Sequence, residues 1–146
     1  MSIRNAMKTL KISIIILFQT FLFTVGNAQT KRTVEDMAKS HQDCLDTGID
    51  MLGCSKHYYF QMDSMLNVVY DKYRATLNNA QKAVLKKEQL NWIKKRDIYF
   101  KKQNKEFQHK FKSGEWGTDM AMITYDNNAE FVKDRVIVLL RKLRKD

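Results

Sequence analysis

The chain has 146 residues, no proline and a formal net charge of +10. Its length suits one domain with one hydrophobic core. The three histidines fit no metal-ligand spacing, and neither a glycine-rich phosphate loop nor a nucleophile motif occurs. We therefore expect a binding protein with no catalytic residues, no metal and no cofactor.

Residues 1–28 have the pattern of a signal peptide. Three basic residues precede an apolar run over residues 12–25, and small residues at Gly26 and Ala28 precede the expected cut. The run is shorter than the roughly 20 residues that span a bilayer, which disfavours the alternative of an uncleaved membrane anchor. No cysteine lies at the cut, so no lipid anchor is expected.

The expected exported domain comprises residues 29–146 and lies in the periplasm or outside the cell, with no transmembrane segment. It carries 23 basic and 16 acidic side chains, a net charge of +7. Because it is exported and shows no nucleic-acid recognition motif, a nucleic-acid partner is not expected.

Both cysteines, Cys44 and Cys54, lie in the exported part. An even number of cysteines in an oxidising compartment predicts one disulfide, and the alternative is a pair of buried free thiols. The bridge would close a short loop and stabilise the fold by about 2–3 kcal/mol.

The distribution of helix formers and helix breakers predicts an all-α bundle of about four helices. Thr47 and Thr118 are the expected N-caps of the second and fourth helices, and Asn78 and Asn79 the turn between the second and third. The expected helices cover residues 34–45, 49–77, 80–110 and 119–143. The second and third would form a long antiparallel hairpin on which the fourth packs.

Apolar residues at three- and four-residue spacing predict the buried faces. In the second helix this stripe comprises Tyr59, Leu66, Tyr70, Tyr73 and Leu77. In the fourth helix a heptad seam comprises Met122, Tyr125, Ala129, Val132, Val136, Leu139 and Leu143. So small a chain has few other surfaces to cover its core, so we expect this seam to pack internally in a monomer.

Two polar motifs face each other in mirror order across the expected hairpin. One contains Asp63, Asn67 and Tyr70, and the other contains Gln89, Trp92, Arg96 and Asp97. The residue numbers of the pairs Asp63–Arg96, Asn67–Trp92 and Tyr70–Gln89 add up to the same value, as they do for facing residues in an antiparallel hairpin. We interpret the motifs as a structural polar network that fixes the register, in which Asp63 and Arg96 form an ion pair. The alternative is a ligand site.

These residues also carry a resemblance. The chain resembles the LprI-like lysozyme-inhibitor N-terminal domain family, small exported helical proteins of bacteria, over about Cys44 to Leu140. The resemblance rests on the cysteine spacing, on Thr47, Met51 and Tyr58 or Tyr59, and on the two polar motifs. Many members have a second disulfide, whose cysteines would stand near Tyr99–Phe100 and Asn127 here. The resemblance implies that packing between Tyr59 and Phe100 replaces it.

The family implies a lysozyme inhibitor, with lysozyme or another envelope protein as the partner. Lysozymes are usually cationic, so a domain of net charge +7 would be repelled at long range. An acidic cluster formed by Glu35, Asp36, Asp43, Asp46 and Asp50 relieves this conflict. Asp43, Asp46 and Asp50 are therefore the candidate partner-binding residues, and the alternative is that they are ordinary solvated acids at helix ends.

A second hypothesis assigns function to the lysine-rich third helix. Its candidate residues are Lys94, Lys95, Lys101 and Lys102, and its partner would be an anionic envelope polymer or another protein. The alternative is an ordinary solvated helix face.

Overall fold

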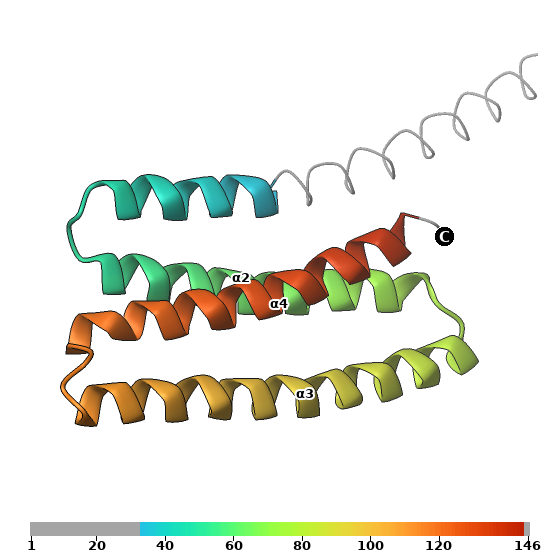
Figure 1. Cartoon of the computed structure of the whole chain (residues 1–146). Coiled ribbons are helices and arrows are strands. Elements are labelled where there is room, and N and C mark those ends of the chain that lie inside the picture. Colours follow the sequence, from blue (N-terminus) through green and yellow to red (C-terminus); the bar gives the residue numbers. More distant parts are fainter. Residues whose placement is uncertain (1–32, 145–146) are drawn as a thin grey trace, which may run out of the picture.

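The computed structural model describes residues 33–144, and the predicted signal peptide lies outside them. A first helix covers residues 33–46, followed by α2 (Met51–Thr76), α3 (Asn79–Lys112), a short 3-10 helix (Thr118–Met120) and α4 (Ala121–Leu143) (Figure 1). The predicted all-α bundle with its long antiparallel hairpin is confirmed.

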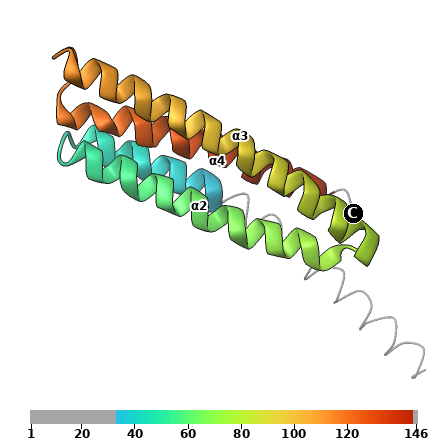
Figure 2. The ribbon, with the colours of Figure 1, turned by 90° about the horizontal axis from the view of Figure 1, so that it is seen from below.

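α4 is the helix around which the bundle is arranged. It packs along α2 most extensively and also contacts α3, whereas α2 and α3 have almost no direct backbone contact. The helix over residues 33–46 and α3 lie on opposite sides of the α2–α4 pair (Figures 1 and 2). The two helices of the hairpin, α2 and α3, are therefore not packed directly on each other, and α4 packs against both of them.

The core lies mainly between α2 and α4. The predicted seam of α4 is confirmed at five positions that are fully or nearly fully buried: Ala129, Val132, Val136, Leu139 and Leu143. On α2 the predicted stripe is only partly right. Leu66 and Leu77 are buried, whereas the three tyrosines are half-buried at its edge. The residues that fill the centre of the face are Tyr58, Met62, Met65 and Val69.

α3 is attached more loosely, with Leu85 as its only buried residue. Its start is well defined, because Asn78 accepts a hydrogen bond from the Gln81 N–H while the Gln81 side chain accepts one from the Asn78 N–H. This capping box satisfies two of the free N–H groups at the helix start. The predicted cap at Thr118 is wrong, since this residue opens the 3-10 helix, whose N-cap is Gly117.

Among the described residues, those of the buried core lie between Val34 and Leu143. A chain that begins at residue 29 therefore retains all of these core residues. Within residues 33–144, no helix is both long and apolar enough to cross a membrane.

Candidate functional site

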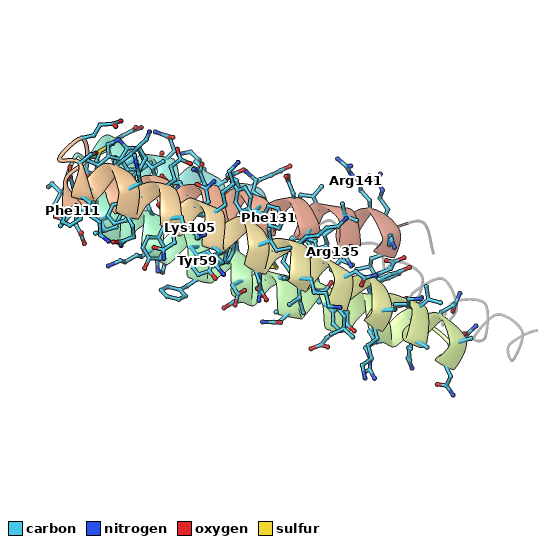
Figure 3. The ribbon with its side chains drawn as sticks, turned by 60° about the horizontal axis from the view of Figure 1, so that its bottom comes forward. Tyr59, Lys105, Phe111, Phe131, Arg135 and Arg141 are labelled. Atoms are coloured by element: carbon cyan, nitrogen blue, oxygen red, sulfur yellow. A yellow bond between two sulfur atoms is a disulfide. The ribbon has the colours of Figure 1, made fainter. Side chains whose placement is uncertain are left out.

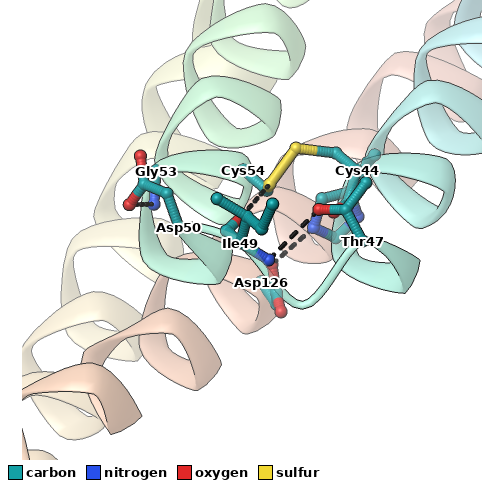
Figure 4. The surroundings of a disulfide bond; sticks show 8 residues. Cys44, Thr47, Ile49, Asp50, Gly53, Cys54 and Asp126 are labelled. Atoms are coloured by element: carbon teal, nitrogen blue, oxygen red, sulfur yellow. Dashed lines mark hydrogen bonds and ion pairs between the residues drawn. A yellow bond between two sulfur atoms is a disulfide. The ribbon is translucent and has the colours of Figure 1, made fainter.

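The predicted disulfide between Cys44 and Cys54 is present, with the two Cα atoms 5.9 Å apart (Figure 4). It joins the end of the first helix to the first turn of α2. Between the two helices, Thr47 Oγ1 donates a hydrogen bond to the Cys44 carbonyl (2.7 Å) and accepts one from the Ile49 N–H (3.1 Å). The turn over residues 47–50 is thus held by a covalent bond and by its own polar contacts.

Asp50, not the predicted Thr47, is the N-cap of α2. Its carboxylate accepts a hydrogen bond from the Gly53 N–H at 3.0 Å, and its backbone is left-handed with φ of 46°. Asp is one of the few non-glycine residues that adopt this conformation readily. The prediction failed because the Thr47 hydroxyl donates its hydrogen bond to the Cys44 carbonyl, at the end of the preceding helix.

The acidic side chains around this turn are exposed. Asp43 forms an ion pair with Lys39 at 2.6 Å, and Asp46 accepts a hydrogen bond from Gln42 at 2.7 Å. Beside them, Ile49 exposes 74% of its surface at the tip of the turn. We call Asp43, Asp46, Ile49 and Asp50 the acidic turn: an exposed apolar residue among three carboxylates.

Beneath the acidic turn lies a pocket of about 230 Å³, lined among others by His41, His57, Tyr58 and the disulfide. His41 stacks flat on Tyr58, with ring centroids 4.3 Å apart and an angle of 4° between the rings. His41 Nε2 lies 3.1 Å from Asp126 Oδ1 of α4. The ring stack joins the first helix to α2, and the contact with Asp126 joins it to α4.

Tyr58 also connects α2 to α4 through its hydroxyl, which donates to Glu130 Oε1 at 2.9 Å. Lys133 Nζ approaches the same carboxylate at 2.9 Å. Burial, followed by the neighbouring Glu130, raises the pKa of Tyr58 far above its ordinary value of 10.0. Tyr58 therefore stays neutral and serves as a buried donor.

The sequence analysis missed the contacts of His41 and Tyr58, because a ring stack between two helices leaves no local spacing pattern.

Among the described residues, no three His, Cys, Asp or Glu side chains gather in a way that could hold a metal ion.

The predicted ion pair between Asp63 and Arg96 is not formed. Arg96 instead donates to Asp97 of its own helix, from Nε at 3.0 Å and from Nη2 at 2.8 Å. Asp63 forms no ion pair within residues 33–144, and its carbonyl accepts a hydrogen bond from the Asn67 side chain. The predicted ion pair is wrong because α4, rather than α3, packs against the buried face of α2.

The second polar motif contacts α4 instead. Gln89 accepts a hydrogen bond from Arg135 Nε at 3.0 Å, and Trp92 stacks on Phe131 with centroids 5.9 Å apart. Both partners are labelled in Figure 3, which views the bundle from the α3 side. Arg96 lies over the Trp92 ring at 5.7 Å, a cation–π contact between neighbouring turns of α3 itself. Tyr70 packs at the edge of the core.

Packing and hydrogen bonding join the helices at the positions where the resemblance implied a second disulfide in other members. Tyr59 and Phe100 are in edge-to-face contact at 5.8 Å, as the resemblance implied. Next to them, Asn127 Nδ2 of α4 donates to Gln103 Oε1 of α3 at 2.9 Å.

The four candidate lysines, Lys94, Lys95, Lys101 and Lys102, are all exposed on α3. None of them takes part in an ion pair with another described residue. They lie on the side of the bundle away from the first helix, which carries Asp43 and Asp46 (Figure 1). The two candidate surfaces are therefore separate.

Comparison with known proteins gives one result. The family model described as "Lysozyme inhibitor LprI" matches residues 38–139, which spans most of the described bundle. No curated protein and no solved structure gives a significant match. The match begins in the first helix and ends in α4, so it includes the disulfide, both polar motifs and all of the core seam except Leu143. The chain belongs to the LprI lysozyme inhibitor family.

Proposed function

We propose that this protein is an exported, non-catalytic inhibitor of lysozyme. The observation that carries the proposal is the family match over residues 38–139. The disulfide supports the exported location, since such bonds persist in oxidising compartments.

The acidic turn is the surface that best fits a cationic enzyme. Between residues 33 and 50 the chain carries five carboxylates and one lysine, whereas α3 carries eleven basic side chains and three acidic ones. Complementary charge accelerates association and excludes wrongly charged partners. Contact through the acidic turn would place attractive charges next to lysozyme and keep the lysines of α3 on the far side of the bundle.

The turn is also pre-organised for binding. The disulfide, the Thr47 hydrogen bonds and the Asp50 cap hold it before a partner arrives. A rigid binding loop loses less conformational entropy on association. Ile49, with 74% of its surface exposed, supplies the apolar contact at its centre.

The test is a lysozyme activity assay with the purified domain of residues 29–146 in excess. We expect the rate of cell-wall hydrolysis to fall as the domain is added. The double variant Asp43→Lys with Asp46→Lys should weaken inhibition by about tenfold or more, because two favourable charges become repulsive. Asp50 is left unchanged because it caps α2.

The matched control is Asp71→Lys with Asp134→Lys, which makes the same change in net charge at exposed positions of α2 and α4. It should inhibit more strongly than the acidic-turn variant. Undiminished lysozyme activity with excess wild-type domain would overturn the proposed function. Equal inhibition by the two double variants would overturn only the assignment to the acidic turn.

A further inference from the structure

The solvent face of α3 carries a continuous line of lysines. At 100° per residue, five of them fall within a sector of about 40° that points away from α4. All five are exposed. We call this set the lysine ridge: Lys87, Lys94, Lys101, Lys105 and Lys112. Figure 3 looks onto α3, where Lys105 is labelled.

The carboxylates of α3 do not neutralise the ridge. Glu88 pairs with Lys142 of α4 at 2.6 Å, Asp97 with Arg96 at 2.8 Å, and Glu106 approaches Lys110 at 3.7 Å. Each acidic side chain of this helix thus faces a cation outside the ridge. Within the described part of the chain, no ion pair involves a ridge lysine.

Apolar side chains flank the ridge on the same exposed face. Ile98 exposes 72% of its surface and Leu90 50%, and the helical period places them about 40° to either side of the ridge. Val84, with 60% exposed, continues the Ile98 side. A solvated lysine face does not require exposed branched aliphatic residues at these positions.

We propose that this face of α3 docks on an anionic lipid surface, with the helix axis parallel to the membrane plane. Ammonium groups attract acidic headgroups, and the flanking aliphatic side chains reach the boundary between headgroups and acyl chains. A helix of 34 residues, roughly 50 Å long, can present these groups along one side of the bundle to a membrane surface.

The mixture of charge and apolar surface distinguishes this partner from others. A soluble polyanion would contact the lysines but leave Leu90 and Ile98 in water. A folded protein partner would have to be complementary along most of α3. A lipid surface satisfies both kinds of side chain without a matching shape. The proposal is independent of lysozyme inhibition, because the acidic turn belongs to the other side of the bundle.

The experiment is co-sedimentation of residues 29–146 with vesicles. This domain lacks the apolar run of residues 12–25, which would bind lipid by itself, and retains every core residue among those that the structure describes. We expect binding to vesicles that contain phosphatidylglycerol, weak or no binding to pure phosphatidylcholine, and a loss of binding as salt is raised.

Two variants separate the contribution of the lysine charges from that of the exposed aliphatic side chains. Lys94→Gln with Lys101→Gln should weaken binding to anionic vesicles by about 30-fold, as expected for removing two lysines near an anionic surface. Leu90→Ser with Ile98→Ser should weaken binding to vesicles but leave binding to soluble polyphosphate unchanged. Unaltered helical circular dichroism and melting would show that both variants are folded.

The control is Arg74→Gln with Arg141→Gln, which removes two charges at exposed positions of α2 and α4. It should bind vesicles more tightly than the Lys94/Lys101 variant. The proposal is overturned if these two variants bind alike, or if the wild-type domain binds polyphosphate but no vesicle. The second result would favour an anionic polymer as the partner.

Discussion

At the scale of single residues, Gly53 is required by the cap of α2. A Cβ atom at this position would clash with the Asp50 carboxylate, which caps the helix. In an ordinary helical position, replacing glycine by alanine stabilises by roughly 0.5–1 kcal/mol. Here Gly53→Ala should instead lower the free energy of unfolding by about 1 kcal/mol, because it displaces the cap. Urea denaturation measures the change.

The explanation is tested by repeating the substitution without the cap. Asp50→Gly keeps a residue that tolerates the left-handed backbone but removes the carboxylate. In that background, Gly53→Ala should become neutral or stabilising. If the alanine is equally harmful in both backgrounds, the clash with Asp50 is not its cause.

Tyr58 links stability to pH. The unfolded side chain loses its proton near pH 10.0, whereas burial raises the pKa of the folded one. The folded state therefore retains a proton that the unfolded state releases, so the free energy of unfolding should fall as pH rises above about 10. Tyr58→Phe should be less stable at neutral pH by about 1 kcal/mol, through loss of the Glu130 hydrogen bond, but should lose less stability on the alkaline side. Urea denaturation across this pH range provides the comparison.

Tyr125→Phe is the matched control at neutral pH, because this half-buried hydroxyl forms no hydrogen bond within residues 33–144. Its stability should stay within about 0.5 kcal/mol of the wild type. A Tyr58→Phe variant with the same alkaline slope as the wild type would contradict the assignment of the pH effect to Tyr58.

At the scale of elements, sequence periodicity predicted α4 well and α2 less well. The fully buried residues of α4 lie on one seam, and a heptad pattern describes such a seam directly, although half-buried residues of α4 also contact α3 and the first helix. α2 packs against both α4 and the first helix, so its buried face is wider than one stripe and includes Tyr58, Met62 and Val69. Spacing within a helix does not reveal how many neighbours that helix will have.

The prediction that the two mirrored polar motifs contact each other failed for a related reason. A constant sum of residue numbers places two residues at the same level of an antiparallel hairpin, as for Tyr59 and Phe100, but it does not decide which helix packs between them. Because α4 joins the arms of the hairpin, Gln89 meets Arg135 and Trp92 meets Phe131. The order in which helices pack depends on contacts between distant segments, which local sequence patterns do not contain.

The attachment of α3 depends on a small aromatic cluster around Phe131. This side chain of α4 stacks on Tyr99 at 4.6 Å and on Trp92 at 5.9 Å. Phe131→Ala should destabilise the domain by about 2 kcal/mol, less than the 3–5 kcal/mol typical of a fully buried phenylalanine, because Phe131 is half-buried. Amide hydrogen exchange should accelerate more in α3 than in α2.

Phe60→Ala is the corresponding control, since this phenylalanine of α2 exposes 60% of its surface. It should change stability by less than about 0.5 kcal/mol. Equal acceleration of exchange in α2 and α3 in the Phe131→Ala protein would show that the cluster supports the whole bundle rather than α3 alone.

At the scale of the whole molecule, the fold turns a charge gradient along the chain into a charge difference between two sides. The sequence predicted where acidic and basic residues concentrate, but not that the first helix and α3 would lie on opposite sides of the α2–α4 pair. One domain can therefore present an acidic turn to a cationic partner and the basic helix α3 to an anionic partner, without the two charged surfaces neutralising each other.

This arrangement predicts how the two surfaces interact during binding to a cationic lysozyme. The lysine ridge repels such an enzyme at long range, while the acidic turn attracts it at contact. Lys94→Gln with Lys101→Gln should therefore associate with lysozyme faster than the wild type at low salt. Stopped-flow measurement of the association rate detects the change. At 1 M salt, where the screening length is roughly 3 Å, the difference should vanish. If this variant instead loses inhibition, α3 itself contacts lysozyme, and the acidic turn is not the inhibitory surface.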